Sequence, residues 1–464
     1  MTRTMEQQPS AAMVEAKPRP RSLLDRLRDR GLAAAGLSSS SAGAFLVLVG
    51  GAGVSYLAQV ATARIVGVES FGLYMYAVAW MVVAATLSTL GFHVSLLRLV
   101  PSYRAKGDWG AMRGVIRFSV SGVAVTGVLV ALCGAALVLY ADQVAELRIA
   151  LLIAMAAAPL FALQLVGAAL VRAFGGVVSA LAPERLGRDA FAVIVLAGLV
   201  GLGLAPATAT TAMTAMLASG AAILAIVTVL GWRFRPAELH GASQQTALRD
   251  WIRPTLPLTV IMGADVVMAR SGIIVLGLLG DARGAGIFAV AFSLSILTAL
   301  PRMAVAAAFA PTVASLHAQG DRDGLQALTR RAARLTLAGA VCVAVPMLVA
   351  MPMLLGFFGP GFAAGAPAAT VLVAGQLVAA AAGPQQHLMT MTGRETAGAA
   401  MHSGGALVGL LLCFLLAGPF GVLGAAVAIS AGVVVWNVAM AWFAYTRLGL
   451  RPGLLAAKTA PSQI

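Results

Sequence analysis

Three charged residues lie inside long apolar stretches of this sequence. Asp265 and Arg270 lie in the run 256–279, and Arg302 follows Pro301 in the run 284–312. An unpaired charge at the centre of a bilayer costs at least about 3 kcal/mol, so such a side chain normally faces a partner or a water-filled cavity. A guanidinium is planar, permanently charged and matched to phosphate oxygens. The two arginines are therefore candidate ligands for a phosphate group.

The alternative for these residues is an ion pair within the membrane. Asp265 precedes Arg270 by five positions, which is about 140° around a helix and makes it a poor partner on the same face. Asp265 is better placed to meet Arg302 from a neighbouring helix. Both interpretations stay open, and we name Arg270, Arg302 and Asp265 as candidate substrate-binding residues.

A second set of polar side chains lies around the end of the first apolar run, and comprises Tyr56, Gln59, Arg64 and Tyr74. The aromatic rings and the amide could contact sugars by stacking or hydrogen bonding, and the arginine could contact an anion. The structural alternatives are core packing for the tyrosines and, for Arg64, extension of the side chain to the lipid headgroups.

A third group, Gln385, Gln386 and His387, follows the pair Gly383-Pro384. A histidine in a hydrated vestibule can take up and release protons near neutral pH. These three residues are therefore candidates for coupling transport to an ion or proton. Hydrogen bonding between helices is the alternative.

Helices long enough to cross a membrane must position these residues. A spanning helix needs about 20 mainly apolar residues to cross about 30 Å of hydrocarbon. The sequence contains twelve such runs, near 42–65, 71–97, 115–140, 148–173, 188–205, 209–231, 256–279, 284–312, 334–358, 364–392, 398–418 and 420–446. With 60% hydrophobic and 11% charged residues, the composition excludes a water-soluble globule. It predicts an all-α polytopic membrane protein.

The strong positive charge fits this topology. The chain has 32 Lys and Arg against 17 Asp and Glu, a net charge of +15, which alone would suggest nucleic acid. Placed on the twelve runs, nearly all the cations fall on one side, whereas Arg64, Arg148 and Arg283 fall on the other. Loops rich in Lys and Arg face the cytoplasm. The charge thus predicts a multi-pass protein with both termini cytoplasmic, and no nucleic-acid partner.

The sequence carries no signature of an enzyme, metal site or cofactor. Cys133, Cys342 and Cys413 lie in apolar runs without paired ligand spacing. The glycine-rich stretches lack the GxxxxGK[ST] pattern of a phosphate loop. We expect no metal, no cofactor and no catalytic residues.

The second half of the chain repeats the first. Residues 76–80 (YAVAW) match 288–292 (FAVAF), and 104–108 (RAKGD) match 317–321 (HAQGD), at offsets of 212 and 213. Six helices per repeat predict two pseudo-symmetric lobes around a central cavity, related by an axis along the membrane normal. The expected parts are a cytoplasmic N-terminal tail (1–41), an N-lobe (42–231), a cytoplasmic linker (232–255), a C-lobe (256–446) and a cytoplasmic C-terminal tail (447–464).

Several segments of this repeat resemble one known family. Residues 63–74 (ARIVGVESFGLY) resemble the motif aRxxGxxxFGxY that follows the first helix of polysaccharide-transporter flippases, and 99–108 (LVPSYRAKGD) are similar to the family's basic loop. Residues 265–291 and 383–394 resemble the corresponding parts of the second half. This family is the O-antigen and exopolysaccharide branch of the multidrug/oligosaccharidyl-lipid/polysaccharide exporter (MOP) superfamily. Phe288 replaces the usual tyrosine of the second-half turn.

The resemblance implies movement of a polyprenyl-diphosphate-linked oligosaccharide from the cytoplasmic to the outer leaflet of the bacterial inner membrane. Such transport serves the synthesis of surface polysaccharides, including lipopolysaccharide and exopolysaccharide. It also implies alternating access, contact with membrane lipid, and as partners a polysaccharide polymerase and chain-length proteins. In relatives, cavity-facing cations meet the diphosphate or acidic sugars.

Two other functions are weighed against this one. An ion-coupled multidrug antiporter of the same superfamily would need an acidic cavity, whereas the apolar runs contain more arginines than acids. A membrane polymerase or glycosyltransferase normally has a long extracytoplasmic loop with catalytic residues, and the outer loops expected here are short. The sign of the buried charge favours an anionic substrate.

Overall fold

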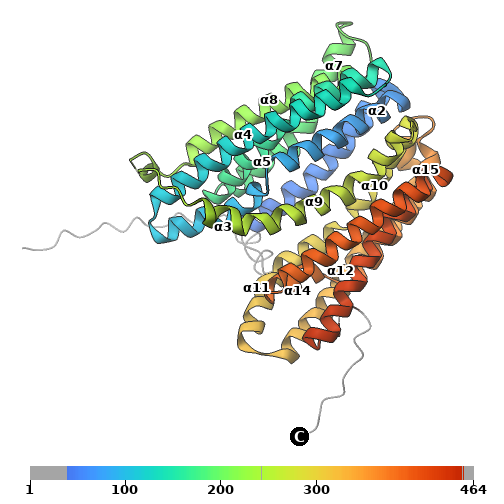
Figure 1. The fold of residues 1–464 in the computed structure, drawn as a ribbon. Coiled ribbons are helices and arrows are strands. Elements are labelled where there is room, and N and C mark those ends of the chain that lie inside the picture. Colours follow the sequence, from blue (N-terminus) through green and yellow to red (C-terminus); the bar gives the residue numbers. More distant parts are fainter. Residues whose placement is uncertain (1–38, 242, 452, 454–464) are drawn as a thin grey trace, which may run out of the picture. The chain divides into compact units, whose positions relative to one another are not determined.

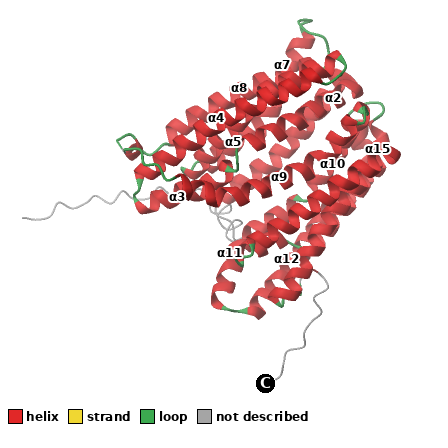
Figure 2. Ribbon diagram, viewed as in Figure 1, coloured by secondary structure: helices red, strands yellow, loops and turns green. Residues whose placement is uncertain are grey.

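The computed structural model of the chain describes residues 39–241, 243–451 and 453. Within these ranges every regular element is a helix and none is a strand (Figure 2). The described residues from Gly43 onward belong to one compact unit, and all contacts below lie within it. Almost all of the expected N-terminal tail (1–41) and most of the expected C-terminal tail (447–464) lie outside the described residues.

The helices of the first half are joined by tight turns (Figure 1). In chain order they are α2 (Ser39–Ser88), α3 (Phe92–Lys106), α4 (Trp109–Tyr140), α5 (Ala145–Ala173), α6 (Val177–Ala182), the π-helix η1 (Pro183–Gly187), α7 (Arg188–Gly201) and α8 (Ala209–Phe234). A short 3₁₀-helix, η2 (Ala237–Leu239), lies in the linker that follows.

The second half has a similar order. Its elements are α9 (Leu248–Leu278), α10 (Ala282–Leu297), α11 (Leu300–Gln319), α12 (Arg322–Gly356), the 3₁₀-helix η3 (Phe362–Gly365), α13 (Ala366–Ala382), α14 (Gln385–Met391) and α15 (Glu395–Leu448).

The twelve expected spans correspond to these elements once the internal breaks are taken into account. Eight described helices are long and apolar enough to cross a membrane, or nine if the bent pair α10 and α11 forms one span. The backbone leaves the helical region at Gly67 within α2 and at Gly421 within α15, which divides each into two spans. The contiguous α6, η1 and α7 supply the remaining one. The described part of the chain is therefore a helical unit of twelve spans.

Matching turns in the two halves confirm the repeat. Gly107 (φ 68°) ends α3 and Gly320 (φ 71°) ends α11, both in the left-handed conformation that glycine adopts without a steric penalty. The next residue caps the following helix in each case. The carboxylate of Asp108 accepts from Ala111 N at 2.9 Å, and that of Asp321 accepts from Gly324 N at 2.8 Å. The sequence Gly-Asp thus makes the same helix-to-helix turn at equivalent positions of the two halves, and Gly280-Asp281 makes it a third time before α10.

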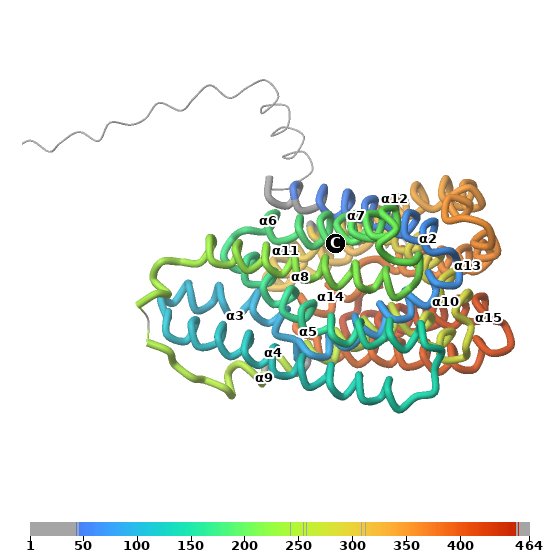
Figure 3. The backbone as a smooth tube through the Cα atoms, turned by 90° about the horizontal axis from the view of Figure 1, so that it is seen from above, coloured from blue at the N-terminus to red at the C-terminus, as the bar shows by residue number. Residues whose placement is uncertain are grey.

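The helices pack mainly with others of their own half. In the first half α5 lies beside α4 and α8, and in the second α15 lies beside α9 and α13; Figures 1 and 3 show the first of these groups from two sides. Because α9 also contacts α3, it joins the two halves. Two six-helix lobes result, as expected from the repeat.

Trp251, near the start of α9, is the main contact of that helix with the first half. Its side chain is fully buried, its Nε1 donates to Tyr103 Oη at 3.1 Å, and its ring lies 5.5 Å from that of Phe118. A buried tryptophan contributes a large apolar area and usually finds a partner for its N–H group.

We call the end of the unit near the linker (residues 235–247) the linker end, and the opposite end, with Gly67, Gly280 and Gly421, the turn end.

At the turn end, the two halves approach so closely that side chains are excluded. A Cβ atom at Gly72 would overlap the carbonyl oxygen of Ala282, at the start of α10. One at Gly277 would overlap the ring of Tyr76. Small residues allow such backbone approach between membrane helices.

We therefore expect Gly72→Ala to destabilise the protein. The added methyl group meets backbone that cannot move without shifting α10, and overpacking of this kind costs about 1–3 kcal/mol. The midpoint of thermal unfolding in detergent should fall. Gly53→Ala is the matched control, because a Cβ at Gly53 meets nothing within 4 Å. Equal midpoints for the two variants would contradict the close contact of the halves.

Candidate functional site

Arg188 lies in the middle of a long helix, not in a loop. The sequence placed the fifth span at 188–205 and Arg188 among the cations of the charged side. In the structure, α6, η1 and α7 run without interruption from Val177 to Gly201. The expected start of the fifth span at residue 188 is therefore wrong, because the helix begins eleven residues earlier. The π-helical turn directly before it is a distortion that often marks functional sites.

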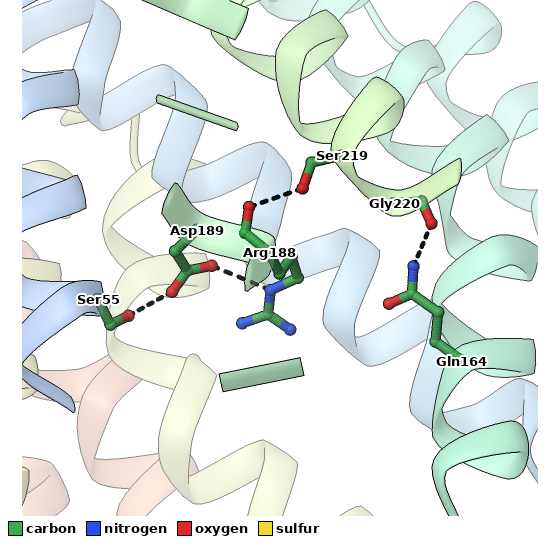
Figure 4. Close-up of polar contacts among 6 residues, drawn as sticks. All are labelled: Ser55, Gln164, Arg188, Asp189, Ser219 and Gly220. Atoms are coloured by element: carbon green, nitrogen blue, oxygen red, sulfur yellow. Dashed lines mark hydrogen bonds and ion pairs between the residues drawn. The ribbon is translucent and has the colours of Figure 1, made fainter. Parts of the chain in front are cut away.

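Arg188 and Asp189 form an ion pair that is bound to the first helix (Figure 4). Arg188 Nε donates to Asp189 Oδ1 at 3.0 Å, and Ser55 Oγ donates to Asp189 Oδ2 at 2.5 Å. The arginine side chain is 30% exposed and the aspartate 15%. The pair is thus mostly enclosed by helices, yet its guanidinium reaches accessible space. Tyr74, which is buried, lies within electrostatic range of both charges.

Neighbouring helices hold the Arg188 backbone and side chain. Ser219 Oγ on α8 donates to the carbonyl oxygen of Arg188 at 2.6 Å (Figure 4). The guanidinium carbon lies 5.7 Å from the centroid of the Phe161 ring on α5, a cation–π distance. Gln164, one turn further on, donates to the carbonyl oxygen of Gly220. The backbone of Arg188 is thus held by α8, its guanidinium lies against the Phe161 ring of α5, and Gln164 links α5 to α8 beside it.

Arg270 joins this group from the second half of the chain. It lies on α9 and interacts electrostatically with both Arg188 and Asp189. Its Nε is buried and has no hydrogen-bond partner among the described residues. Glu184 and Arg185, on η1, also act electrostatically on the Arg188–Asp189 pair. Three guanidinium groups thus share the region with two carboxylates, and the region carries a net positive charge.

Asp265 has a partner that the sequence did not suggest. Its carboxylate lies 2.7 Å from Nε2 of His402, on the first half of α15. Arg302, on α11, is an electrostatic neighbour of Asp265, as considered from the sequence. Asp265 and Arg270 are on the same helix but interact with different residues, so they do not form one site.

The candidates near the end of the first span contact the other half of the chain. Tyr56 Oη donates to the carbonyl oxygen of Leu354 at 2.9 Å, and Gln59 Oε1 accepts from Ser293 Oγ at 3.1 Å. Arg64 donates from Nε to Phe357 O at 2.7 Å and from Nη2 to Gly356 O at 3.1 Å. These side chains link α2 to α10 and α12.

Aromatic packing reinforces this link at the turn end. Phe71 contacts Phe358 and Phe362, with ring centroids 6.5 and 5.7 Å apart. The ring of Tyr56 meets that of Phe358 edge-on at 5.4 Å. The turn end of the unit is therefore closed by contacts between the two halves.

The third candidate group lies where α13 gives way to α14. Gly383 (φ 84°) and Pro384 break the helix there. Gln385 is buried and its Nε2 donates to Ala382 O at 2.7 Å, whereas His387 is exposed and interacts electrostatically with Arg302. Gln386 is half-buried. Their role in ion coupling stays a prediction.

The sequence alone did not identify four residues of these contacts, namely Arg188, Asp189, Ser55 and His402. The dipeptide Arg188-Asp189 lies between two apolar segments, 177–182 and 190–201, each of which is short for a span. Joining them would have placed the pair inside a helix. No local sequence pattern marked His402, because its partner Asp265 lies on a helix that is distant in sequence. In the described ranges, no group of three or more His, Cys, Asp or Glu residues could hold a metal ion.

The sequence matches the model of one known protein family. The model of a family described as polysaccharide biosynthesis protein matches residues 41–317, more than half of the chain. No curated protein matches it in sequence.

Solved structures share the fold at low sequence identity. An inward-facing multidrug resistance transporter of the MATE family, in the MOP superfamily, matches with a TM-score of 0.73 and 14% identity over 86% of this chain and 94% of that chain. The lipid II flippase MurJ, in an inward closed conformation, gives 0.66 and 13% over 86% and 87%. An outward-facing MATE family transporter gives 0.60 and 12% over 88% and 96%. The fold is that of the MOP superfamily.

We expect Arg64→Gln to loosen the turn end, since the variant loses the donors that bind Gly356 and Phe357. Spin labels at Val144 and Phe420, both exposed at this end, would report the separation of the halves by double electron–electron resonance. The background would be a cysteine-free protein in nanodiscs. A broader or longer distance distribution is expected for Arg64→Gln.

Arg148→Gln is the matched control for this experiment. Arg148 also lies near the turn end, but its Nη2 contacts the carbonyl oxygen of Gln143 in its own half at 3.5 Å. Its replacement should leave the distribution unchanged. An unchanged distribution for Arg64→Gln as well would show that the arginine does not hold the halves together.

Proposed function

Because the chain belongs to the polysaccharide biosynthesis protein family and has the fold of MOP-superfamily transporters, we propose that it is a lipid-linked oligosaccharide flippase. Its substrate would be an oligosaccharide joined through a diphosphate to a polyprenyl lipid. It would carry this substrate from the cytoplasmic to the outer leaflet of the bacterial inner membrane by alternating access. The observation that carries the proposal is the cationic group of Arg188 and Arg270.

The charge of this group suits a diphosphate. The guanidinium groups of Arg188, Arg270 and the neighbouring Arg185, with the carboxylates of Asp189 and Glu184, leave one net positive charge. A diphosphate that links a lipid to a sugar carries two negative charges, one on each phosphorus. Guanidinium forks bind such oxygens by paired, charge-assisted hydrogen bonds, which are among the strongest in proteins.

Binding would change the partners of Arg188. In the structure Asp189 occupies one edge of the guanidinium, while Ser55 donates to the other carboxylate oxygen. An incoming diphosphate competes with Asp189 for Arg188 and also reaches Arg270, on the other half of the chain. The headgroup would thus bridge the two halves, while the polyprenyl tail stays in the lipid.

The closed turn end sets the direction from which the substrate enters. With Arg64, Tyr56 and Phe71 holding the halves together there, we infer that the substrate enters from the linker end. Loops at the linker end carry most of the Lys and Arg residues, which is the pattern of a cytoplasmic side. We therefore assign the described conformation to the inward-facing state and both termini to the cytoplasm.

A multidrug antiporter of the same superfamily is the main alternative. Substrates of that kind are often cations, and a cavity that binds them needs an excess of carboxylates. The Arg188–Arg270 group has the opposite sign. A polymerase or glycosyltransferase is also less consistent with the structure, because turn-end connections such as 141–144 and 279–281 are short.

Replacement of either arginine should weaken binding of the diphosphate headgroup. A hydrogen bond to a charged group contributes about 1.5–3 kcal/mol, which corresponds to roughly 10- to 150-fold in affinity. We expect losses of this size for Arg188→Gln and Arg270→Gln. The measurement is binding of a short-chain polyprenyl diphosphate to the protein in nanodiscs.

Two further variants make this measurement specific. Arg249→Gln removes an exposed cation at the linker end and should leave the affinity unchanged. Arg270→Lys keeps the charge without the planar fork and should lie between wild type and Arg270→Gln. Wild-type affinity in both Arg188→Gln and Arg270→Gln would refute the assignment of the site.

A deletion strain tests the function itself. Loss of a flippase should leave lipid-linked oligosaccharide assembled but confined to the cytoplasmic leaflet, where externally added sugar-modifying reagents cannot reach it. Complementation with wild type, but not with Arg188→Gln at equal protein level, should restore its exposure. Failure to assemble the oligosaccharide would instead indicate an enzyme, and drug sensitivity with normal oligosaccharide would indicate an antiporter.

A further inference from the structure

The contact between Asp265 and His402 is a second polar site, separate from the arginine group. It joins α9 to the first half of α15 through the 2.7 Å distance between Oδ1 and Nε2. The histidine side chain is 6% exposed, whereas the aspartate is 45% exposed. The imidazole is thus buried behind a carboxylate that reaches accessible space.

The surroundings of His402 leave one ring nitrogen without a partner. A carboxylate only accepts hydrogen bonds, so the neutral imidazole donates its Nε2 proton to Asp265. Its Nδ1 is buried and has no hydrogen-bond partner among the described residues. The ring packs edge-on against Trp436, with centroids 4.9 Å apart and planes at 69°. The imidazole can therefore take up one more proton, at Nδ1.

Charged groups on two neighbouring helices lie near this pair. Arg302, from α11, interacts with Asp265, and the exposed His387, from α14, interacts with Arg302. Arg270 lies further along α9 and interacts with Arg188 and Asp189 instead. With His402 neutral, Asp265 balances Arg302, and protonation of His402 adds one positive charge.

The repeat places this contact at a position equivalent to that of Asp189. His402 follows Asp189 by 213 residues, the offset found between the Gly-Asp turns. Ser55–Asp189 joins the first and fifth spans of the first half, and Asp265–His402 joins the first and fifth spans of the second. Each half thus has one polar bond between the same two helices, and only the second contains a histidine.

We infer that Asp265 and His402 form a proton-binding site that couples proton movement to transport. A proton from the aqueous phase binds the Nδ1 lone pair of His402, and the hydrogen bond from Nε2 to the carboxylate becomes an ion pair. The stronger attraction holds α9 to α15 and favours the conformation described here. Release of the proton restores the neutral imidazole and weakens that link.

Coupling of the proton to transport rests on the proposed function, whereas protonation of the site does not. A proton that enters from the outer side would promote return of the empty carrier to the inward-facing state, where Asp265 is accessible and the proton can leave. Outward movement of substrate would then be paired with inward movement of a proton.

Tryptophan fluorescence tests protonation without any substrate. An imidazolium quenches an indole that it contacts more strongly than a neutral imidazole does, so Trp436 should report His402. We expect the fluorescence of the protein in nanodiscs to fall in one step as the pH is lowered. The step should vanish in His402→Gln and in Trp436→Phe.

His317→Gln is the control, because that histidine is exposed at the end of α11. It should keep the wild-type step. The same step in His402→Gln as in wild type would overturn the proton site. Arg188→Gln should also keep the step, so a failure of the proposed substrate site can be told apart from a failure of this one.

Proteoliposomes loaded with a pH-sensitive dye test the coupling. Movement of a short-chain polyprenyl-diphosphate oligosaccharide down its gradient should change the internal pH with wild-type protein. Substrate movement without a dye response in His402→Gln supports coupling through this site. A dye response of wild-type size in His402→Gln would refute it.

Discussion

A charge among apolar helices must have a partner, and this constraint explains the polar interior of the molecule. Arg188 can remain inside a span because Asp189 and the Phe161 ring contact its guanidinium. Asp189 in turn is held by Ser55 from another helix. The π-helical turn η1 lies directly before Arg188 and Asp189, at a place in the helix where such distortions often accompany functional sites. Each of these contacts requires a particular residue on α2, α5 or α8. The positions of those residues therefore constrain how the helices of the first half pack.

Much of the fold could be predicted from the sequence because hydrophobic length and charge asymmetry are local signals. The twelve runs, the Gly-Asp turns at 107–108 and 320–321 and the two-lobe duplication all appear as local patterns in the sequence. The start of the fifth span did not, because residues 183–189 contain Pro, Glu, Arg and Asp within a helix that tertiary contacts stabilise. The polar residues of that segment predict a loop. Only their contacts with α2 and α8 show that the segment is helical.

The candidate site was predictable only in part, for a related reason. A lone arginine such as Arg270 is conspicuous in an apolar run, so its position could be recognised from the sequence. The partners of Arg188 and Asp265 could not, since Ser55 and His402 are distant in sequence and unremarkable by composition. Arg64, Tyr56 and Gln59 were noticed as polar residues, yet only the structure shows that they bind α10 and α12.

Trp251 has a consequence for how the protein is made. Its fully buried ring fills a space formed by Tyr103 and Phe118, which belong to the first half. During synthesis the first six spans enter the membrane before α9 leaves the ribosome, so that space is empty for a time. The first half then serves as a template on which the second begins to assemble. The order of the two halves along the chain thereby sets the order in which they assemble. Two halves made as separate chains would lack this order.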